Sequence, residues 1–253
     1  MSNIFVYGIH AVRALLQARP DLIRSLAVQA NRQDERLNQL IALAEKHKIS
    51  IRPLSRQELT QLAKQAEHQG VVAECEALPQ YQESDLACLV SSLPKPGLIL
   101  VLDGVQDPHN LGACLRSADA FGVSLVIIPK NNSVAITPVV RKVACGAAET
   151  IPLVTVTNLA RSLELLKEHE YWLVGTAAEA EESIAQIDFK MNTVLVMGGE
   201  GSGLRRLTKE SCDYLASIPM QGSVSSLNVS VATAVCLYEI QRQRLSLGVR
   251  PAK

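Results

Sequence analysis

Three loops of this sequence carry residues whose types and spacing suit chemistry, and the first is DGVQDPHNLGACLRSADAFGV at residues 103–123. It leaves an apolar run typical of a strand and enters a helix, for which Asp107 and Pro108 are typical start residues. Asn110 lies beside the first helical turn, and Arg116 lies on the exposed stripe of the same helix. Arg116 is then an exposed cation at the carboxyl edge of a parallel sheet, where ligands bind in such folds.

The exposed stripe of this helix also has a purely structural interpretation. Gly112, Arg116 and Asp119 share one face through their i, i+4 and i+7 spacing. We expect Gly112 to leave room for a ligand to approach the backbone. Arg116 could equally form a surface ion pair with Asp119 or Asp103, and spacing alone does not decide between the two.

The second loop, VMGGEGSGLRRL at residues 196–207, is rich in glycine and follows another apolar run. Its glycines permit positive φ angles and close approach to a ligand, and they are Gly198, Gly199, Gly201 and Gly203. The complete G-x-G-x-x-G pattern of a dinucleotide-binding loop is missing, and Glu200 would repel a pyrophosphate. A carboxylate among glycines suits a cation or a hydroxyl-rich ligand better. The alternative is a turn that binds nothing.

The third loop lies within residues 217–244, where a short strand ends at Pro219 and a polar turn follows. Asn228 is the predicted cap of the next helix. This helix is apolar nearly all round for three turns, a pattern typical of burial on both sides. It therefore packs either against a second subunit or in an ordinary core.

The elements that must position these loops form an alternating pattern in the second part of the chain. Near-continuous apolar runs predict parallel strands covered on both faces, at residues 98–104, 124–129, 171–176 and 193–199. Helical spacing fills the intervals, at residues 111–121, 138–146, 158–169 and 228–244. The fold class is therefore α/β, with a doubly covered parallel sheet over residues 98–253.

The first 75 residues predict a separate small α/β domain. Helices are expected at residues 9–17, 34–47 and 55–66, and strands at 22–29, 49–54 and 71–75. The last of these helices begins with the capping-box pair Ser55 and Glu58. This domain holds ten Lys/Arg and seven Asp/Glu, a weak basic excess in a chain of zero net charge, which points to a polyanion or simply to a solvated surface. Residues 76–97 are expected to be a linker with a short helix.

The composition is that of a globular protein. Of 253 residues, 47% are hydrophobic and 20% are charged, which excludes disorder as the main state. The longest apolar run, at residues 97–105, meets Asp103 well before the roughly 18 residues that a membrane span needs. We identify no signal peptide, so we expect a cytoplasmic protein with reduced cysteines. The six cysteines form no C-x-x-C pair, and we expect no metal.

In order and spacing, the three loops resemble the motifs of the SpoU/TrmH group of the SPOUT methyltransferases. The matching stretches are N-L-G-A-C-L-R-S-A, M-G-G-E-G-S-G and I-P-M-x-G-S-V-S-S-L-N-V-S-V-A. The amino-terminal Y-G-I-H-A-V belongs to the same resemblance, which covers essentially the whole chain. Any one motif alone is weak, but three in register are highly specific.

The resemblance implies a fold, a cofactor and partners. The carboxyl-terminal domain is expected to contain a deep trefoil knot that binds S-adenosyl-L-methionine, and to form a homodimer through the apolar terminal helix. The amino-terminal domain is expected to be of the ribosomal-protein L30e type and to bind rRNA. The implied reaction is methyl transfer to the ribose 2′-hydroxyl of a guanosine in the peptidyl-transferase loop of 23S rRNA.

Site residues carry over where this sequence matches the motifs. The candidate catalytic residues are Asn110, Arg116, Glu200, Ser226 and Asn228. Members of the family hold the cofactor mainly through backbone groups, which here implies Thr176, Gly198, Gly201, Ile218, Met220, Leu227 and Asn228. Asn110 and Glu200 are expected to orient Arg116, while Ser226 and Asn228 shape the contacts with ribose and cofactor.

The role of Arg116 has two interpretations. The family assigns proton removal to this arginine, but a guanidinium normally stays charged above pH 12. Gripping the phosphate beside the target ribose and stabilising oxyanion charge is the easier role to defend. His109, which is adjacent to Asn110, is a weaker candidate base because the motif does not require it. The same chemistry on tRNA or another rRNA site, and a non-catalytic role in rRNA assembly, remain alternatives.

Overall fold

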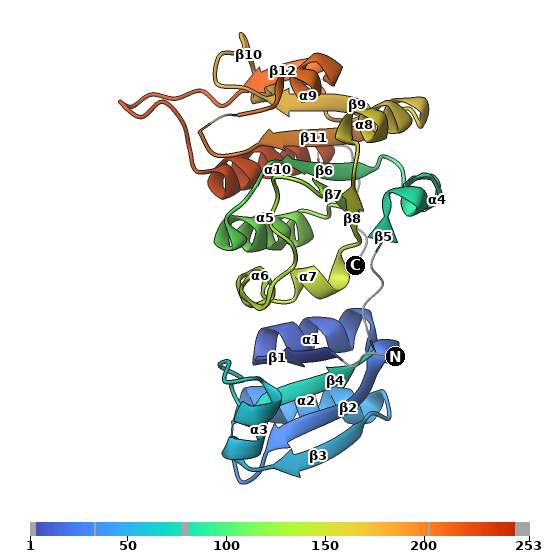
Figure 1. The fold of residues 1–253 in the computed structure, drawn as a ribbon, viewed down its shortest axis with the longest axis vertical. Coiled ribbons are helices and arrows are strands. Elements are labelled where there is room, and N and C mark those ends of the chain that lie inside the picture. Colours follow the sequence, from blue (N-terminus) through green and yellow to red (C-terminus); the bar gives the residue numbers. More distant parts are fainter. Residues whose placement is uncertain (1–3, 33, 77–80, 202, 246–253) are drawn as a thin grey trace. The chain divides into compact units, whose positions relative to one another are not determined.

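A computed structural model describes residues 4–32, 34–76, 81–201 and 203–245 of the chain (Figure 1). The chain divides into two compact units. The first comprises Met1–Pro79 with Cys145–Thr150, and the second comprises Gln80–Ala144 with Ile151–Lys253. The short helix α7 (Ala147–Thr150) is therefore grouped with the first unit, although it lies far along the sequence.

The first unit is a four-stranded mixed sheet with three main helices. Its elements are β1 (Ile4–Tyr7), α1 (Ile9–Ala18), a 3₁₀ turn (Pro20–Leu22), β2 (Ile23–Gln29), α2 (Glu35–Lys46), β3 (Ser50–Leu54), α3 (Arg56–Leu62) and β4 (Val71–Cys75). The strand order is β1-β4-β2-β3, in which β4 is antiparallel to both neighbours and β2 is parallel to β3. The helices and strands predicted from the sequence are present, and β1 is an additional strand.

Alternation along the strands explains how both faces of this sheet are covered. Val71 and Ala73 of β4 pack with α1 and α2, whereas Val72 packs with Leu59 of α3. The predicted capping box at the start of α3 is confirmed, because Ser55 N donates to Glu58 Oε2 at 2.7 Å and Glu58 N donates to Ser55 Oγ at 3.3 Å.

The second unit is an eight-stranded parallel sheet in the order β10-β12-β9-β11-β6-β7-β8-β5. Its strands are β5 (Tyr81–Gln82), β6 (Leu98–Asp103), β7 (Leu125–Pro129), β8 (Leu153–Val156), β9 (Trp172–Thr176), β10 (Glu182–Ser183), β11 (Thr193–Gly198) and β12 (Tyr214–Ser217). Every residue of β6 and β7 is buried, as the continuous apolar runs predict.

Helices cover both faces of this sheet (Figure 1). They are α4 (Leu86–Ser92), α5 (Pro108–Ala120), α6 (Pro138–Ala144), α8 (Leu159–Glu168), α9 (Arg206–Ser211) and α10 (Val229–Leu245), with 3₁₀ turns at Glu83–Asp85 and Ile184–Gln186. Helices α4 and α8 share one core with β6 to β8, and α10 packs on α5 and β11. The α/β class with a parallel sheet is thus confirmed, and the deep knot stays a prediction.

The segment predicted as a linker with a short helix, residues 76–97, contains that helix as α4. Strand β5 pairs with β8, and Leu86 and Val90 of α4 are buried in the core of the second unit. Leu86, Leu89, Val90 and Leu93 follow helical spacing in the sequence, but this spacing does not show which unit the helix packs on. Their packing extends the second unit to the start of β5.

Helix α10 has one buried and one exposed face in the chain that the structure describes. Thr233, Cys236 and Leu237 are buried, whereas Val231, Val235 and Tyr238 are 48%, 39% and 59% exposed. The helix is therefore buried on one side only within a single chain.

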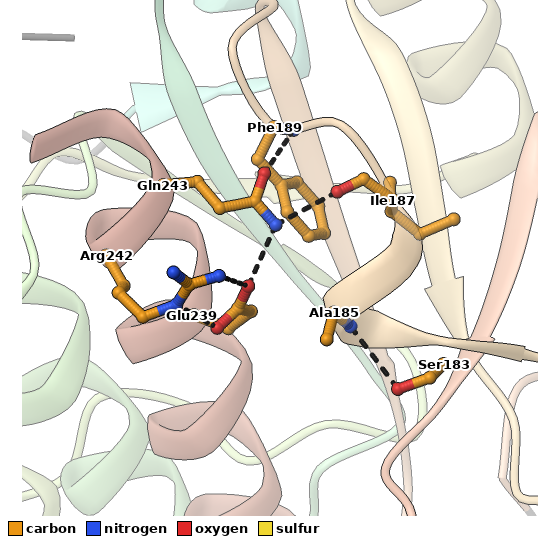
Figure 2. Close-up of polar contacts among 7 residues, drawn as sticks. All are labelled: Ser183, Ala185, Ile187, Phe189, Glu239, Arg242 and Gln243. Atoms are coloured by element: carbon orange, nitrogen blue, oxygen red, sulfur yellow. Dashed lines mark hydrogen bonds and ion pairs between the residues drawn. The ribbon is translucent and has the colours of Figure 1, made fainter. Parts of the chain in front are cut away.

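The last turns of α10 are fastened to the segment that precedes β11 (Figure 2). Gln243 Nε2 donates to the carbonyl of Ile187 at 3.0 Å, and Gln243 Oε1 accepts from Phe189 N at 3.1 Å. The neighbouring ion pair of Arg242 with Glu239 lies along the helix itself at 2.8 Å.

Arg244 completes this attachment from a buried position. Its guanidinium donates to four carbonyls and one hydroxyl at 2.8–3.3 Å, those of Phe189, Pro96, Gly97, Met191 and Thr193. Burial lowers the pKa of Arg244 to about 10. The carbonyls accept the hydrogen bonds that water would otherwise accept from this cation, so its burial is tolerated. The same bonds hold the end of α10 against the starts of β6 and β11.

We predict that Arg244→Met lowers the free energy of unfolding by about 3 kcal/mol, because several buried carbonyls lose their donor. Urea unfolding followed by the fluorescence of Trp172, the only tryptophan, reports on the second unit. Arg242→Met is the matched control, since its side chain is 56% exposed, and it should cost less than about 1 kcal/mol. Equal losses in the two variants would contradict this account.

Candidate active site

The three motif loops meet at one edge of the parallel sheet. They follow β6, β11 and β12, and the loop after β9 joins them, because the carboxyl ends of parallel strands share an edge. A cavity of about 580 Å³ opens there. Its lining includes all seven residues predicted to hold a cofactor: Thr176, Gly198, Gly201, Ile218, Met220, Leu227 and Asn228.

Asn110, Glu200 and Asn228 form a hydrogen-bonded cluster at this edge. Asn228 Nδ2 donates to Asn110 Oδ1 at 3.1 Å and to Glu200 Oε1 at 3.2 Å. Asn110 Nδ2 donates to the same oxygen of Glu200. One residue comes from each motif loop, so the cluster exists only when all three loops are in place.

Asn228 has a second task at the start of α10. Its Oδ1 accepts from Ser230 N at 2.9 Å and from Ser230 Oγ at 2.6 Å. This is the predicted helix cap. The same side chain thus fixes the helix start and, through its amide nitrogen, the two other loops. Ser226 is exposed and lines the cavity beside Asn228.

The glycine loop needs its glycines for close packing as well as for its turn. A Cβ on Gly198 would lie 2.2 Å from the carbonyl carbon of Gly203, and one on Gly199 would lie 2.5 Å from the carbonyl oxygen of Gly104. Gly203 N also donates to the carbonyl of Gly199 at 3.1 Å. Gly201, with φ +76°, has no atom within 4 Å of such a Cβ, so its freedom serves the backbone turn.

An ion pair between the buried Asp103 and the exposed Arg205 holds the glycine loop against the end of β6. Asp103 is 1% exposed, and its carboxylate accepts from Arg205 Nε at 2.6 Å and from Arg205 N at 3.3 Å. The spacing of the first loop suggested Asp103 as a partner for Arg116, and that alternative is wrong because Arg205 occupies it. In the sequence Arg205 is marked only by its position directly after the glycine loop. That position does not predict which carboxylate it pairs with.

Arg116 lies on the exposed face of α5, outside the cluster. Within the described ranges it makes no hydrogen bond or ion pair, so the structure does not bring it into contact with Asn110 or Glu200. Six residues, or about 9 Å of helix, separate it from Asn110 along α5. Its guanidinium is free to meet a ligand from outside.

The space expected beside Gly112 is filled by protein. A Cβ at this position would lie 2.7 Å from Val143 Cβ and 2.9 Å from the carbonyl oxygen of Val140, so α6 packs directly on the glycine. The expectation of a ligand site there is wrong. Helical spacing identifies a face of α5 but not the element that covers it.

Cys114 is a packing residue, as its place on the helix predicts. It is fully buried, its sulfur lies 3.5 Å from Thr233 Oγ1 of α10, and burial raises its pKa to about 11. A thiol with this pKa is a poor nucleophile at neutral pH.

The described parts of the chain contain no group of three or more His, Cys, Asp or Glu side chains placed to hold a metal ion. No helix among them combines the length and the apolar character required to cross a membrane.

We predict that Arg205→Met costs about 2 kcal/mol or more in unfolding free energy, because it leaves the buried Asp103 carboxylate unpaired. Arg206→Met is the control, since Arg206 pairs with Glu210 at the surface with its side chain 78% exposed. Adding Asp103→Asn to Arg205→Met should recover part of the loss. Failure of the double variant to recover any stability would show that the unpaired charge is not the cause.

Comparison with known proteins supports one family over the whole length. The profile of the SpoU rRNA Methylase family matches residues 97–238, and that of RNA 2′-O ribose methyltransferase substrate binding matches residues 5–81. The 23S rRNA (guanosine-2′-O-)-methyltransferase RlmB of Coxiella burnetii is 55% identical over 94% of this chain and 95% of its own length. The enzyme of the same name from Escherichia coli is 52% identical over 94% and 98%.

Solved structures agree with this comparison. The SpoU methyltransferase AviRb from Streptomyces viridochromogenes superposes with a TM-score of 0.77 at 26% identity, covering 99% of this chain and 92% of that one. The TrmH/SpoU tRNA modifying enzyme of A. aeolicus gives a TM-score of 0.57 at 32% identity, covering 67% of this chain and 86% of that one. The chain therefore belongs to the SpoU rRNA methylase family.

Proposed function

We propose that this protein transfers the methyl group of S-adenosyl-L-methionine to the ribose 2′-hydroxyl of a guanosine in the peptidyl-transferase loop of 23S rRNA. The observation that carries the proposal is the Asn110–Glu200–Asn228 cluster, of which Glu200 and Asn228 line a ligand-sized cavity. The choice of a 23S rRNA guanosine is supported by relatives of that activity at 52–55% identity over 94% of the chain.

The cavity fits S-adenosylmethionine in size and chemistry. Its volume of about 580 Å³ lies within the range of small-molecule sites, roughly 300–1,000 Å³. Among the described lining residues the ionisable ones are Glu179, Glu200 and Lys209, and their net charge of −1 suits a cofactor whose net charge is +1. When bound, this cofactor supplies an electrophilic methyl group on sulfonium sulfur.

Arg116 is assigned the role of a clamp on the RNA. A guanidinium stays protonated near neutral pH, so it serves poorly as a base. Its exposed position on α5 suits a phosphate next to the target ribose. Its charge stabilises the negative charge that develops on the 2′-oxygen as this oxygen attacks the methyl group and the hydroxyl proton passes to solvent water. Asn110 and Glu200 then act through the geometry of the loops and not by direct contact with Arg116.

The cluster and its neighbours position the ribose. Glu200 Oε1 already accepts from two amides, which fixes its carboxylate in orientation. Ser226 and Asn228 lie on the cavity lining, where they can contact both the ribose and the cofactor. Holding nucleophile and methyl group in line supplies a large share of the rate.

We assign rRNA binding to the first unit and methyl transfer to the second. The boundary between the two functions is the segment predicted at residues 76–97. The first unit's excess of basic residues and its match to a substrate-binding family support rRNA binding. Because its proposed substrate is ribosomal RNA, we propose that the protein acts in the cytoplasm.

A homodimer through α10 is also part of the proposal. The exposed side chains of Val231, Val235 and Tyr238 form an apolar stripe, and Tyr238 packs edge-on to Phe121, the residue after α5, with ring centroids 6.3 Å apart. A second copy of this chain would bury the stripe.

We predict that Arg116→Ala lowers methyl transfer at least about 100-fold, because phosphate grip and charge stabilisation are lost together. The measurement is incorporation of label from S-adenosylmethionine into a protein-free 23S rRNA transcript, mapped by 2′-O-methyl-sensitive primer extension. The wild type should give a single stop at the peptidyl-transferase-loop guanosine. Arg161→Ala, an exposed arginine of α8 outside the cavity lining, should keep full activity.

Other outcomes of this measurement would change the proposal in different ways. Label in tRNA but not in 23S rRNA would retain the chemistry and overturn the target. Label in neither RNA, together with intact cofactor binding, would favour an assembly factor or a precursor particle as substrate.

We predict that Gly198→Ala weakens binding of S-adenosylhomocysteine at least about tenfold, because the added Cβ displaces the backbone of the glycine loop from the cavity. Isothermal titration calorimetry measures the change. Gly222→Ala is the control, since no atom lies within 4 Å of the added Cβ and the residue does not line the cavity. Unchanged affinity in Gly198→Ala would remove this loop from the cofactor site.

A further inference from the structure

An ion pair at the cavity has no role in the family motifs. Lys209 Nζ lies 2.5 Å from Glu179 Oε1, and both residues line the cavity. Glu179 belongs to the loop after β9, and Lys209 belongs to α9. Their side chains are 68% and 36% exposed respectively, so the pair lies at the rim and remains accessible to a ligand.

The strand order places this ion pair away from the catalytic cluster. Along the sheet edge the strands run β6, β11, β9 and β12. Asn110 follows β6 and Glu200 follows β11, whereas Glu179 follows β9, and Lys209 of α9 is placed beside it by their ion pair. If the methyl group of the cofactor faces the cluster, the rest of the cofactor lies toward β9 and β12.

The lining at this end is made of small and apolar side chains. Ala177, Ala216 and Ile218 come from the ends of β9 and β12, and Leu204 comes from the end of the glycine loop. Such walls suit a flat heteroaromatic ring, with the polar groups that fix its orientation at the rim. The ring of the cofactor carries a ribose with two vicinal hydroxyls.

A carboxylate at the rim is the group that recognises such a diol. An ionised carboxylate is an acceptor with about four lone-pair sites, so it can keep the bond to Lys209 and still accept from a hydroxyl. Acidic residues read ribose hydroxyls in the same way in dinucleotide-binding folds. The hydrogen bond from Lys209 lowers the pKa of Glu179, which keeps this acceptor ionised.

We infer that Glu179 accepts hydrogen bonds from the ribose hydroxyls of the cofactor's adenosine and that Lys209 positions Glu179 for this contact. The inference rests on the proposed function, because it concerns the same cavity. Glu179 is a binding residue, and Lys209 is a positioning residue. The closed ion pair favours a neutral diol over the charged amino-acid end of the cofactor, because a zwitterion would have to separate Glu179 from Lys209.

The test compares three ligands on one substitution by isothermal titration calorimetry. Glu179→Ala should weaken S-adenosylhomocysteine about tenfold, the scale of a hydrogen bond to a charged group. It should weaken 5′-methylthioadenosine by the same factor, because this ligand keeps the ribose and lacks the amino-acid end. It should change the affinity for the 2′,3′-dideoxy analogue of S-adenosylhomocysteine less than about twofold.

Two variants complete the design. Glu181→Ala, an exposed carboxylate two residues away that does not line the cavity, should leave all three affinities unchanged. Lys209→Met should weaken the two ribose-bearing ligands about threefold and spare the dideoxy analogue, because Glu179 remains but loses its orientation. Equal melting temperatures of the variants exclude a folding defect.

Several outcomes would overturn the inference. In Glu179→Ala these are an equal loss of affinity for the dideoxy analogue, a loss of affinity confined to ligands with the amino-acid end, or unchanged affinity for all three ligands. If wild-type protein binds none of the three ligands, the proposed function fails as well. If it binds them and methylates RNA but Glu179→Ala behaves like Glu181→Ala, only the inference about Glu179 fails.

Discussion

The ion pair between the buried carboxylate of Asp103 and Arg205 is the interaction on which the site depends. Asp103 ends β6 and Arg205 follows the glycine loop, so their bonds at 2.5–3.3 Å bring the loops after β6 and β11 together. Glycines at the contact allow the two backbones to pack without Cβ atoms between them. The consequence is that Glu200 reaches Asn110, 90 residues away in sequence.

Helix α10 begins after Asn228, the third residue of the cluster, and is held at both ends. At its start, Asn228 caps the helix and bonds to Asn110 and Glu200. At its end, the buried Arg244 donates to carbonyls at the starts of β6 and β11. Attachment at two points restrains the position of the helix relative to the three motif loops, which suits the proposed reaction because that reaction depends on positioning.

The elements of this fold were largely predictable, but their partners were not. Continuous apolar runs identified β6, β7, β9 and β11, and the capping residues located the starts of α3 and α10. The three motifs predicted that Asn110, Glu200 and Asn228 share one site, and the three side chains are hydrogen-bonded at one edge of the parallel sheet. Periodicity could not reveal that α6 covers Gly112, that Arg205 takes Asp103, or that two-residue strands such as β5 extend the sheet, because these depend on contacts between distant segments.

The central claim is that Asn110, Glu200 and Asn228 act as one assembled unit. Single-turnover methyl transfer to the 23S rRNA transcript by Asn110→Ala, Asn228→Ala and the double variant tests it most directly. Residues that act as a unit are strongly non-additive, so the double variant should be slower than the more impaired single variant by less than about threefold. Independent, multiplicative losses in the double variant would contradict the account, because they would mean that each side chain contributes to the rate separately.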